Sequence, residues 1–241
     1  MFQVTHRCHN RGFLLKFARD RDAYRATLRE QVRKFEVWVL DYCLTSNHIH
    51  LLLDAEERSE IGRLMQAVEG QFARAYNWRK ERQNAYWGDN YHATQIEEGE
   101  YLWRCLCYIE MNMVRSGVVE HAKDWRWVGY HEIMGTRRRY RLIDLERLCW
   151  RLGTNCLEDV RQNLAASLEG AIAREQVKRE GHWTESLAVG SKGFVEKAKP
   201  MALSRLETEI VEAEPELWIL KEAMVAYGQK TGPKNGCKAL K

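Results

Sequence analysis

Residues 36–54 read EVWVLDYCLTSNHIHLLLD, and this stretch decides the fold. Residues 36–44 are rich in the β-branched and aromatic side chains that favour strands, and residues 48–54 form a second apolar run. A short polar segment, Thr45-Ser46-Asn47, separates the two runs. Two strand-like segments joined by a tight polar connection predict an antiparallel β-hairpin.

Segments on either side of this hairpin extend it into a sheet covered by helices. Short β-rich runs predict further strands, and apolar residues that recur every three or four positions predict helices. We expect strands over residues 2–8 and 92–97, and helices over residues 20–35, 59–82 and 99–116. The order strand, helix, strand, strand, helix, strand, helix predicts an α+β fold in which an antiparallel sheet carries helices on one face.

The composition changes near residue 148. From Leu145 onward the sequence is rich in Ala, Glu and Leu, which favours helices. We therefore expect a first domain over residues 1–148 and a mostly helical carboxy-terminal extension over residues 149–241. Neither part contains an evident internal repeat.

The overall composition argues against several classes of protein. The formal net charge of +4 is too small to argue for a nucleic-acid partner, so the arrangement of charge matters more. Seven cysteines without a C-x-x-C pair argue against a disulfide framework and a zinc ribbon, and they fit a reducing compartment. The chain contains no apolar run near the ~18 residues that a membrane span requires. We expect a cytoplasmic protein with no membrane partner.

The sharpest chemical feature is the pair His48 and His50 in the second strand of the hairpin. Successive side chains of a strand point to opposite faces, so the two imidazoles share one face while Ile49 enters the core. Two imidazoles about 7 Å apart along a strand can chelate one divalent ion if a third ligand approaches from another element. The alternative is a pair of partly buried histidines bonded to their neighbours, and an H-x-H alone favours that alternative.

A second feature lies in the helix expected over residues 99–116. Tyr108 and Asn112 are four positions apart, so they lie one turn apart on the same helix face. Considered alone, this pair is better explained as a tyrosine hydrogen-bonded at a helix surface. Tyr108 and Asn112 together with the two histidines favour a functional site over this structural explanation.

Three strings occur in order along the chain: SNHIHLLL at 46–53, YHAT at 91–94 and CLCYIEMNMVRSGVV at 105–119. Together they resemble the single-tyrosine HUH transposases, which are IS200-like, and in particular the REP-associated tyrosine transposases. The resemblance covers about residues 2–145 and extends more loosely to GHWTESLAVGSKGFV at 181–195. It implies the ferredoxin-like or RRM-like sheet of the HUH nuclease fold.

The resemblance also implies a role for each matching residue. His48, His50 and Asn112 match the ligands of a Mg²⁺ or Mn²⁺ ion, and Tyr108 matches the nucleophile that attacks a DNA phosphate. The attack leaves a 5′-phosphotyrosine link and a free 3′-hydroxyl, which can later rejoin the strand. The implied partner is single-stranded or hairpin DNA, such as repetitive extragenic palindromes, bound by a monomer or a homodimer.

Several further residues are candidates for DNA contacts, each with a structural alternative. Arg115 can hold a phosphate or form a surface salt bridge, and His92 is better explained as a structural histidine at the start of a strand. The dense basic run Arg137, Arg138 and Arg139 can grip phosphates or can be a solvated surface.

Two other functions stay open at this stage. A domesticated protein could keep the fold and bind single-stranded or hairpin DNA without cutting it, and a metal-dependent phosphodiesterase could use water in place of tyrosine. A protein that only binds DNA has no need of His48, His50, Tyr108 and Asn112 together, and this favours the transposase. The tail string assigns only a structural role to Trp183.

Overall fold

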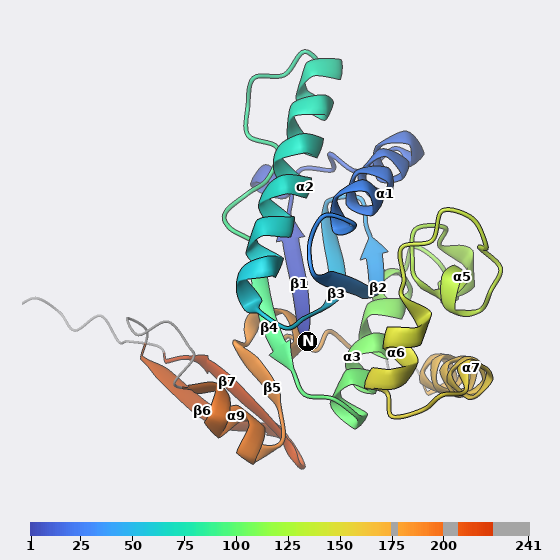
Figure 1. Ribbon diagram of the computed structural model, residues 1–241, viewed down its shortest axis with the longest axis vertical. Coiled ribbons are helices and arrows are strands. Elements are labelled where there is room, and N and C mark those ends of the chain that lie inside the picture. The colour runs from blue at the N-terminus through green and yellow to red at the C-terminus, as the bar shows by residue number, and fades with distance from the viewer. Residues whose placement is uncertain (175–177, 200–206, 224–241) are drawn as a thin grey trace, which may run out of the picture.

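The computed structural model describes residues 1–174, 178–199 and 207–223, so parts of the predicted extension lie outside the described residues. The described residues form one sheet of seven strands in the order β2-β3-β1-β4-β5-β7-β6 (Figure 1). The strands are β1 (Phe2–Arg7), β2 (Val37–Leu44), β3 (His48–Ala55), β4 (His92–Ile96), β5 (Ala188–Gly190), β6 (Thr208–Glu214) and β7 (Leu217–Glu222).

The hairpin predicted over residues 36–54 is confirmed. Strands β2 and β3 pair antiparallel, with Leu44 opposite Ile49 and Cys43 opposite His50. Strand β1 pairs antiparallel with both β3 and β4, so the first four strands have the order of a ferredoxin-like sheet. The predicted α+β class is therefore confirmed.

The helices follow the predicted order but differ in detail. The helix expected over residues 99–116 divides at Met111, where ψ is 0°, into α3 and α4. The α-helices are α1 (Ala18–Val32), α2 (Arg58–Arg79), α3 (Glu100–Glu110), α4 (Asn112–Arg115), α5 (Tyr130–Ile133), α6 (Leu145–Arg151), α7 (Leu157–Ala173), α8 (His182–Glu185) and α9 (Lys192–Ala198). Short 3₁₀ turns occur at η1 (His9–Arg11) and η2 (Ala122–Asp124).

Helices cover both faces of the sheet, whereas the sequence predicts them on one face. The side chain of His6 in β1 turns toward α2, where it pairs with Glu69. The preceding residue of β1, Thr5, points to the opposite face, and its Oγ1 atom lies 3.3 Å from Nδ1 of His50. Asn112 meets His50 on this second face, so the end of α3 covers the side that α2 leaves open. Both faces of β1 are buried, and alternation along the strand therefore requires cover on both sides.

The carboxy-terminal part lengthens the sheet, which the sequence does not predict. Strand β5 pairs parallel with β4, β7 pairs antiparallel with β5, and β6 pairs antiparallel with β7. Helices α7, α8 and α9 lie in the predicted extension, which they share with these three strands, and α6 crosses the predicted boundary. Strand β5 is only three residues long and β6 is largely solvent-accessible, so neither carries the apolar pattern by which strands are recognised.

A buried carboxylate holds helix α6, which spans the predicted domain boundary, against the sheet. Asp54 in β3 accepts a hydrogen bond from Nε of Arg147 at 2.6 Å and another from Nε of Arg151 at 2.8 Å, both from α6. The Asp54 side chain has no solvent exposure, so its charge depends on these two partners. The pairing holds α6 against the end of β3.

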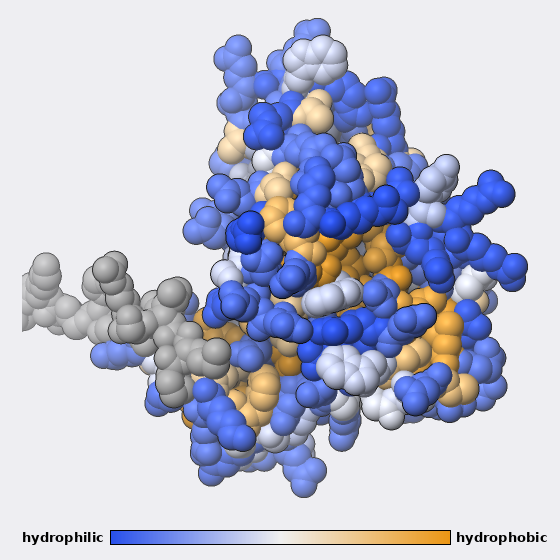
Figure 2. Space-filling model, viewed as in Figure 1, coloured by the Kyte–Doolittle hydropathy of each residue, from blue (hydrophilic) through white to orange (hydrophobic). Residues whose placement is uncertain are grey.

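The core of the molecule lies on the central strands. Val4, Ile49, Leu51 and Leu53 are fully buried, while hydrophilic residues cover most of the face seen in Figure 2. Among the residues that the structure describes, none of the helices has both the length and the hydropathy needed to cross a membrane.

Candidate active site

The two histidines of the central strand lie side by side on one face of the sheet. His48 and His50 have ring centroids 4.8 Å apart and an interplanar angle of 75°. His50 is almost fully buried, and His48 is half-buried at the start of β3. The strand alternation that the sequence predicts is therefore confirmed, and Ile49 between them lies in the core.

Hydrogen bonds fix the tautomer of His48. Its Nδ1 lies 2.7 Å from Oδ1 of Asn47 and 2.9 Å from Oγ1 of Thr45. A carboxamide oxygen can only accept, so Nδ1 carries the proton and donates it to Asn47. Nε2 of His48 therefore keeps a lone pair that is free to bind a metal ion.

Gln3 orients the ring of His50, as Asn47 orients the ring of His48. The Gln3 amide nitrogen lies 2.8 Å from Nδ1 of His50, while the Gln3 Oε1 atom is buried and has no hydrogen-bond partner in the described part of the chain. Rotation of this amide by 180° lets Oε1 accept a hydrogen bond from Nδ1–H of His50, and the amide nitrogen then takes the position that the oxygen occupied. Nε2 of His50 then presents its lone pair to Asn112, whose amide group lies 2.8 Å away.

These three side chains form what we call the active-site cluster: His48, His50 and Asn112. Rotation of the Asn112 amide places its oxygen beside Nε2 of His50, where the amide nitrogen lies now. Two neutral imidazoles and an amide oxygen suit Mn²⁺ and tolerate Mg²⁺, so the residues present fit a divalent ion. The orphaned Gln3 oxygen is the observation that supports this fit, because metal-binding histidines commonly donate their second ring proton to such a group.

The surroundings keep both imidazoles neutral. Burial, aided by the positive charges of Arg7 and Arg179, lowers the pKa of His48 to about 3. Burial also lowers the pKa of His50 well below its usual value, with a further contribution from His48. Only the neutral ring can ligate a metal ion, so both rings are in the required state at neutral pH.

Tyr108 faces the same site from helix α3. Its ring centroid lies 6.1 Å from that of His50, and the guanidinium of Arg115 lies 3.9 Å from the centre of the phenol ring. Burial lowers the pKa of Arg115, whereas Tyr108 raises it. Nη2 of Arg115 is buried and makes no hydrogen bond within the described residues, as expected of a group that awaits an anion.

These groups line one cavity of about 210 Å³. Three arginines at its wall supply positive charge, and the cluster and Tyr108 supply the chemistry. The lining residues are Arg7, His48, His50, Tyr108, Asn112, Arg115, Ser116, Arg179 and Thr184. A cavity with this lining can hold a phosphate group beside a phenol oxygen and a bound cation.

The other candidate residues lie outside this cavity. His92 in β4 has its Nε2 atom 2.8 Å from the carbonyl oxygen of Ser186, which agrees with a structural role, although it also lines a neighbouring cavity of about 230 Å³. Arg137 donates to Oη of Tyr42 at 2.8 Å, and Arg138 donates to a backbone carbonyl within its own loop. Together with Arg139, which is exposed, these arginines are not brought to the active-site cluster.

Sequence reasoning missed two arginines that line the cavity, Arg7 and Arg179. Arg7 had a signal, because it ends β1 directly opposite His48 in the strand register. Arg179 had none, since it comes from the extension and reaches the site only through tertiary structure. The sequence assigns Trp183 a structural role without showing what it supports. Trp183 is fully buried, and its ring lies 6.3 Å from that of Tyr108, so it forms part of the support behind the phenol.

Comparisons with known proteins show which chains this protein resembles. Residues 1–112 match the family model described as IS200-like transposase. A protein of Haemophilus influenzae whose name assigns it to the REP-associated tyrosine transposases is 26% identical over 118 residues, which is 45% of this chain and 67% of that protein. A solved structure of a REP-associated tyrosine transposase bound to a REP hairpin matches 56% of this chain and 78% of its own, with a TM-score of 0.50 and 16% sequence identity. The family resemblance predicted from the sequence is therefore confirmed.

Proposed function

Because the chain resembles the REP-associated tyrosine transposases in sequence and in fold, we propose that it cleaves and rejoins single-stranded DNA that contains hairpins, through a 5′-phosphotyrosine intermediate. One observation supports this proposal above the others. Tyr108, the active-site cluster and three arginines line a single cavity, although they come from β1, β3, α3, α4 and the extension. A protein that only binds DNA needs the arginines but neither the tyrosine nor the metal ligands.

The residues of the cavity would act in sequence on the scissile phosphate. Arg7, Arg115 and Arg179 would hold the phosphate by charge-assisted hydrogen bonds. The Tyr108 oxygen would then attack phosphorus, forming the tyrosine–phosphate bond as the bond to the 3′ oxygen breaks. The phenol proton is lost and the departing 3′ oxygen gains one, so the step balances without an added reagent.

A divalent ion held by His48, His50 and Asn112 would neutralise the phosphate oxygens and the charge that develops during the transfer. The chain contributes the orientation of these ligands. Asn47 and Gln3 orient the two rings through their Nδ1 atoms, and burial keeps both rings neutral. Since the link conserves the energy of the phosphodiester bond, the free 3′-hydroxyl can reverse the reaction and rejoin the strand.

The proposed substrate is hairpin DNA of the kind named for the structural relative, which is bound to a REP hairpin. A monomer or a homodimer that acts on this DNA stays a prediction. Phosphate contacts would supply affinity, and the shape of the hairpin would position the single-stranded segment in the cavity.

The decisive experiment traps the covalent intermediate. The protein is incubated with hairpin DNA labelled at its 3′ end and with Mn²⁺ or Mg²⁺, and the products are separated under denaturing conditions. We expect a labelled protein–DNA adduct that Tyr108→Phe abolishes. Tyr101→Phe is the matched control, because Tyr101 also belongs to α3 but donates to the carbonyl oxygen of Glu216, outside the cavity.

Each alternative function predicts a different outcome. If wild-type protein binds the hairpin but gives neither cleavage nor an adduct, it is a DNA-binding protein on the same fold. If Tyr108→Phe still cleaves with multiple turnover, water is the nucleophile and the chain is a phosphodiesterase. Either result would overturn the proposed transposase.

A further inference from the structure

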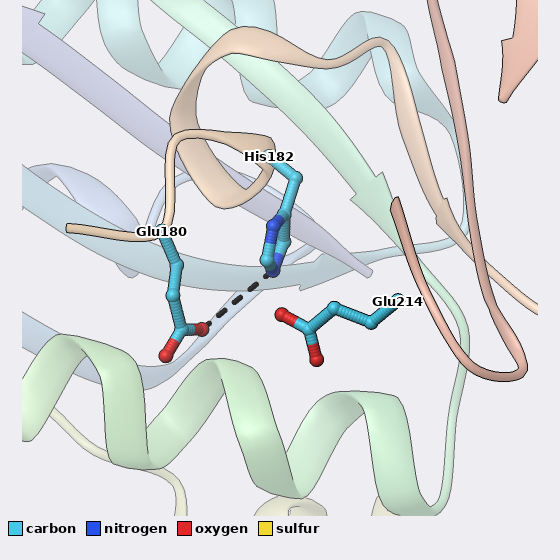
Figure 3. A group of neighbouring side chains, drawn as sticks. All are labelled: Glu180, His182 and Glu214. Atoms are coloured by element: carbon cyan, nitrogen blue, oxygen red, sulfur yellow. Dashed lines mark ion pairs between the residues drawn. The ribbon is translucent and has the colours of Figure 1, made fainter. Parts of the chain in front are cut away.

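A second cluster of possible metal ligands lies in the extension, outside the cavity just described. Glu180, His182 and Glu214 each offer one ligand atom, and these atoms all lie within 4.8 Å of one another. We call this the extension cluster. Figure 3 shows the imidazole between the two carboxylates, with Oε2 of Glu180 3.6 Å from Nε2 of His182. The three side chains come from the segment before α8, from α8 itself and from the end of β6.

The histidine of this cluster has a buried nitrogen that nothing satisfies. Only 10% of the His182 side chain is exposed, and its Nε2 atom has no hydrogen-bond partner among the residues that the structure describes. A buried ring nitrogen that makes no hydrogen bond is unfavourable, and a cation bound between it and the two carboxylates would satisfy all three groups.

The positive charge of a neighbouring arginine limits which cation the extension cluster can bind. Arg104 of α3 forms an ion pair with Glu214, so one of the two carboxylates is partly neutralised. A monovalent ion would gain little from the remaining charge. A divalent ion with affinity for both nitrogen and oxygen ligands gains from all three side chains, and Zn²⁺ has this preference. The ligand atoms of a tetrahedral zinc site lie about 3.3 Å apart, so the most widely separated ligand atoms of this cluster must approach one another by at most about 1.5 Å. Rotation of the partly exposed glutamate side chains allows this movement.

We propose that Glu180, His182 and Glu214 form a second divalent-cation site, of the type that binds Zn²⁺, and that this site joins the β6–β7 hairpin to α8. The proposal does not depend on DNA cleavage by the chain. None of the three residues lines the candidate active-site cavity. The two sites are nevertheless linked through Trp183, whose Nε1 donates to Oε2 of Glu180 at 2.6 Å and whose ring packs near Tyr108.

Through Trp183, a cation bound at the extension cluster would stabilise the residues that support Tyr108. Trp183 follows His182 directly in the chain, and their ring centroids lie 4.8 Å apart. A cation that holds Glu180 and His182 in place would therefore also hold the indole that supports Tyr108. The site would stabilise the extension against the first domain, with no group of its own in contact with the scissile phosphate.

The test measures Zn²⁺ binding by full-length protein in which the active-site cluster cannot bind. His48→Ala/His50→Ala is the reference protein, and serine replaces Cys156, an exposed thiol, and Cys237 to remove competing ligands. Equilibrium dialysis against Zn²⁺ should give one bound equivalent. Adding His182→Ala should weaken binding at least tenfold, because the nitrogen ligand is lost.

Further variants separate a metal site from a folding effect. Glu214→Gln changes a carboxylate that is 41% exposed, so it should keep the fold and still weaken Zn²⁺ binding. Arg104→Gln should strengthen binding several-fold by freeing that carboxylate. Glu185→Gln is the matched control, because Glu185 lies on α8 but pairs with Arg179 outside the cluster, and it should leave binding unchanged.

Thermal unfolding tests the same proposal independently of the dialysis measurement. Saturating Zn²⁺ should raise the Tm of the reference protein and should not raise that of the Glu214→Gln or His182→Ala proteins. The proposal is overturned if the reference protein binds no Zn²⁺, or if it binds one equivalent that neither substitution weakens. If protein with His48 and His50 intact does not cleave hairpin DNA while the reference protein binds Zn²⁺ as expected, the proposed function fails and the second cation site stands.

Discussion

The active-site cluster and the extension cluster both combine imidazole with oxygen-bearing side chains, but they are assembled in different ways. His48 and His50 are two residues apart on a central strand, and a hydrogen-bonding side chain orients each ring. In the extension cluster a one-turn helix carries His182, and Glu180 and Glu214 are 43% and 41% exposed. Both clusters need one ligand from a distant segment, but the histidine pair of the first is preorganised on a strand with supporting hydrogen bonds, whereas the ligands of the second lie on short or partly exposed segments.

This difference predicts different consequences of substitution. A change in the active-site cluster should remove chemistry while the surrounding sheet keeps the fold. A change near the extension cluster should first reduce the stability with which the extension holds to the first domain. The predictions below test this contrast, from the largest expected effect to the smallest.

The largest effect is expected for His50→Ala. Loss of this ligand should reduce metal-dependent nicking of hairpin DNA about 1000-fold, since a bound divalent ion contributes several kcal/mol to the transition state and each 1.36 kcal/mol is a factor of ten. Hairpin binding, measured by fluorescence anisotropy without divalent ions, should stay within about threefold. His121→Ala is the control, because His121 caps η2 and should nick normally. A His50→Ala protein that nicks within tenfold of wild type would remove His50 from the metal site.

Much of the active-site cluster could be predicted because its geometry is local. Alternation along β3 places His48 and His50 on one face, and a four-residue helical spacing aligns Tyr108 with Asn112. What brings the strand pair and the helix pair together is the packing of α3 on the sheet, and only the family resemblance pointed to that. The sequence could not give the face that α3 covers, because both faces of β1 are buried.

The structure of the extension was less predictable because its strands depend on pairing with other strands and not on a pattern of their own. Strand β5 is a strand because it pairs with β4 and β7, and its three residues carry no periodic pattern of their own. Arg179 and Trp183 reach the cavity by tertiary contacts that no spacing in the chain encodes. Trp183 was rightly given a structural role, but its position behind Tyr108 appears only in three dimensions.

Trp183→Ala should give the largest loss of stability. The indole is fully buried, and removal of a buried tryptophan costs about 3–5 kcal/mol because a cavity remains. Urea unfolding followed by circular dichroism measures the free energy of unfolding. Trp78→Ala is the control, because Trp78 is 85% exposed and its loss should cost little. If the Trp183 protein keeps its stability, the extension does not depend on this residue, and the contrast between the two regions fails.

Asp54→Asn should destabilise the junction between β3 and α6 by about 2 kcal/mol at pH 7, because Arg147 and Arg151 lose the charge of their buried partner. Burial alone would raise the pKa of Asp54, but the hydrogen bonds and charges of the two arginines outweigh burial and lower it. The pair therefore contributes fully above the ordinary carboxyl pKa of about 3.9 and loses its contribution as pH falls through the lowered value.

The pH profile makes this prediction specific. The difference in unfolding free energy between wild type and Asp54→Asn should be constant from pH 5 to pH 8 and should shrink as the pH falls below about 4. Asp22→Asn is the matched control, because Asp22 forms an exposed pair with Arg126 that is worth well under 1 kcal/mol. A difference that grows on acidification would show that the Asp54 carboxyl is protonated in the folded protein at neutral pH.

The smallest effect is expected for the two arginines that approach the cavity from different regions. Arg7 ends a strand of the first domain and Arg179 belongs to the extension, yet both line the same cavity. If each holds a phosphate, Arg7→Ala and Arg179→Ala should each weaken hairpin binding several-fold and lower the slope of log K against log salt by about one. Arg63→Ala should change neither quantity, because Arg63 pairs with Glu60 on α2. Loss of one phosphate contact for Arg7→Ala together with an unchanged slope for Arg179→Ala would confine DNA binding to the first domain and leave the extension a purely structural part.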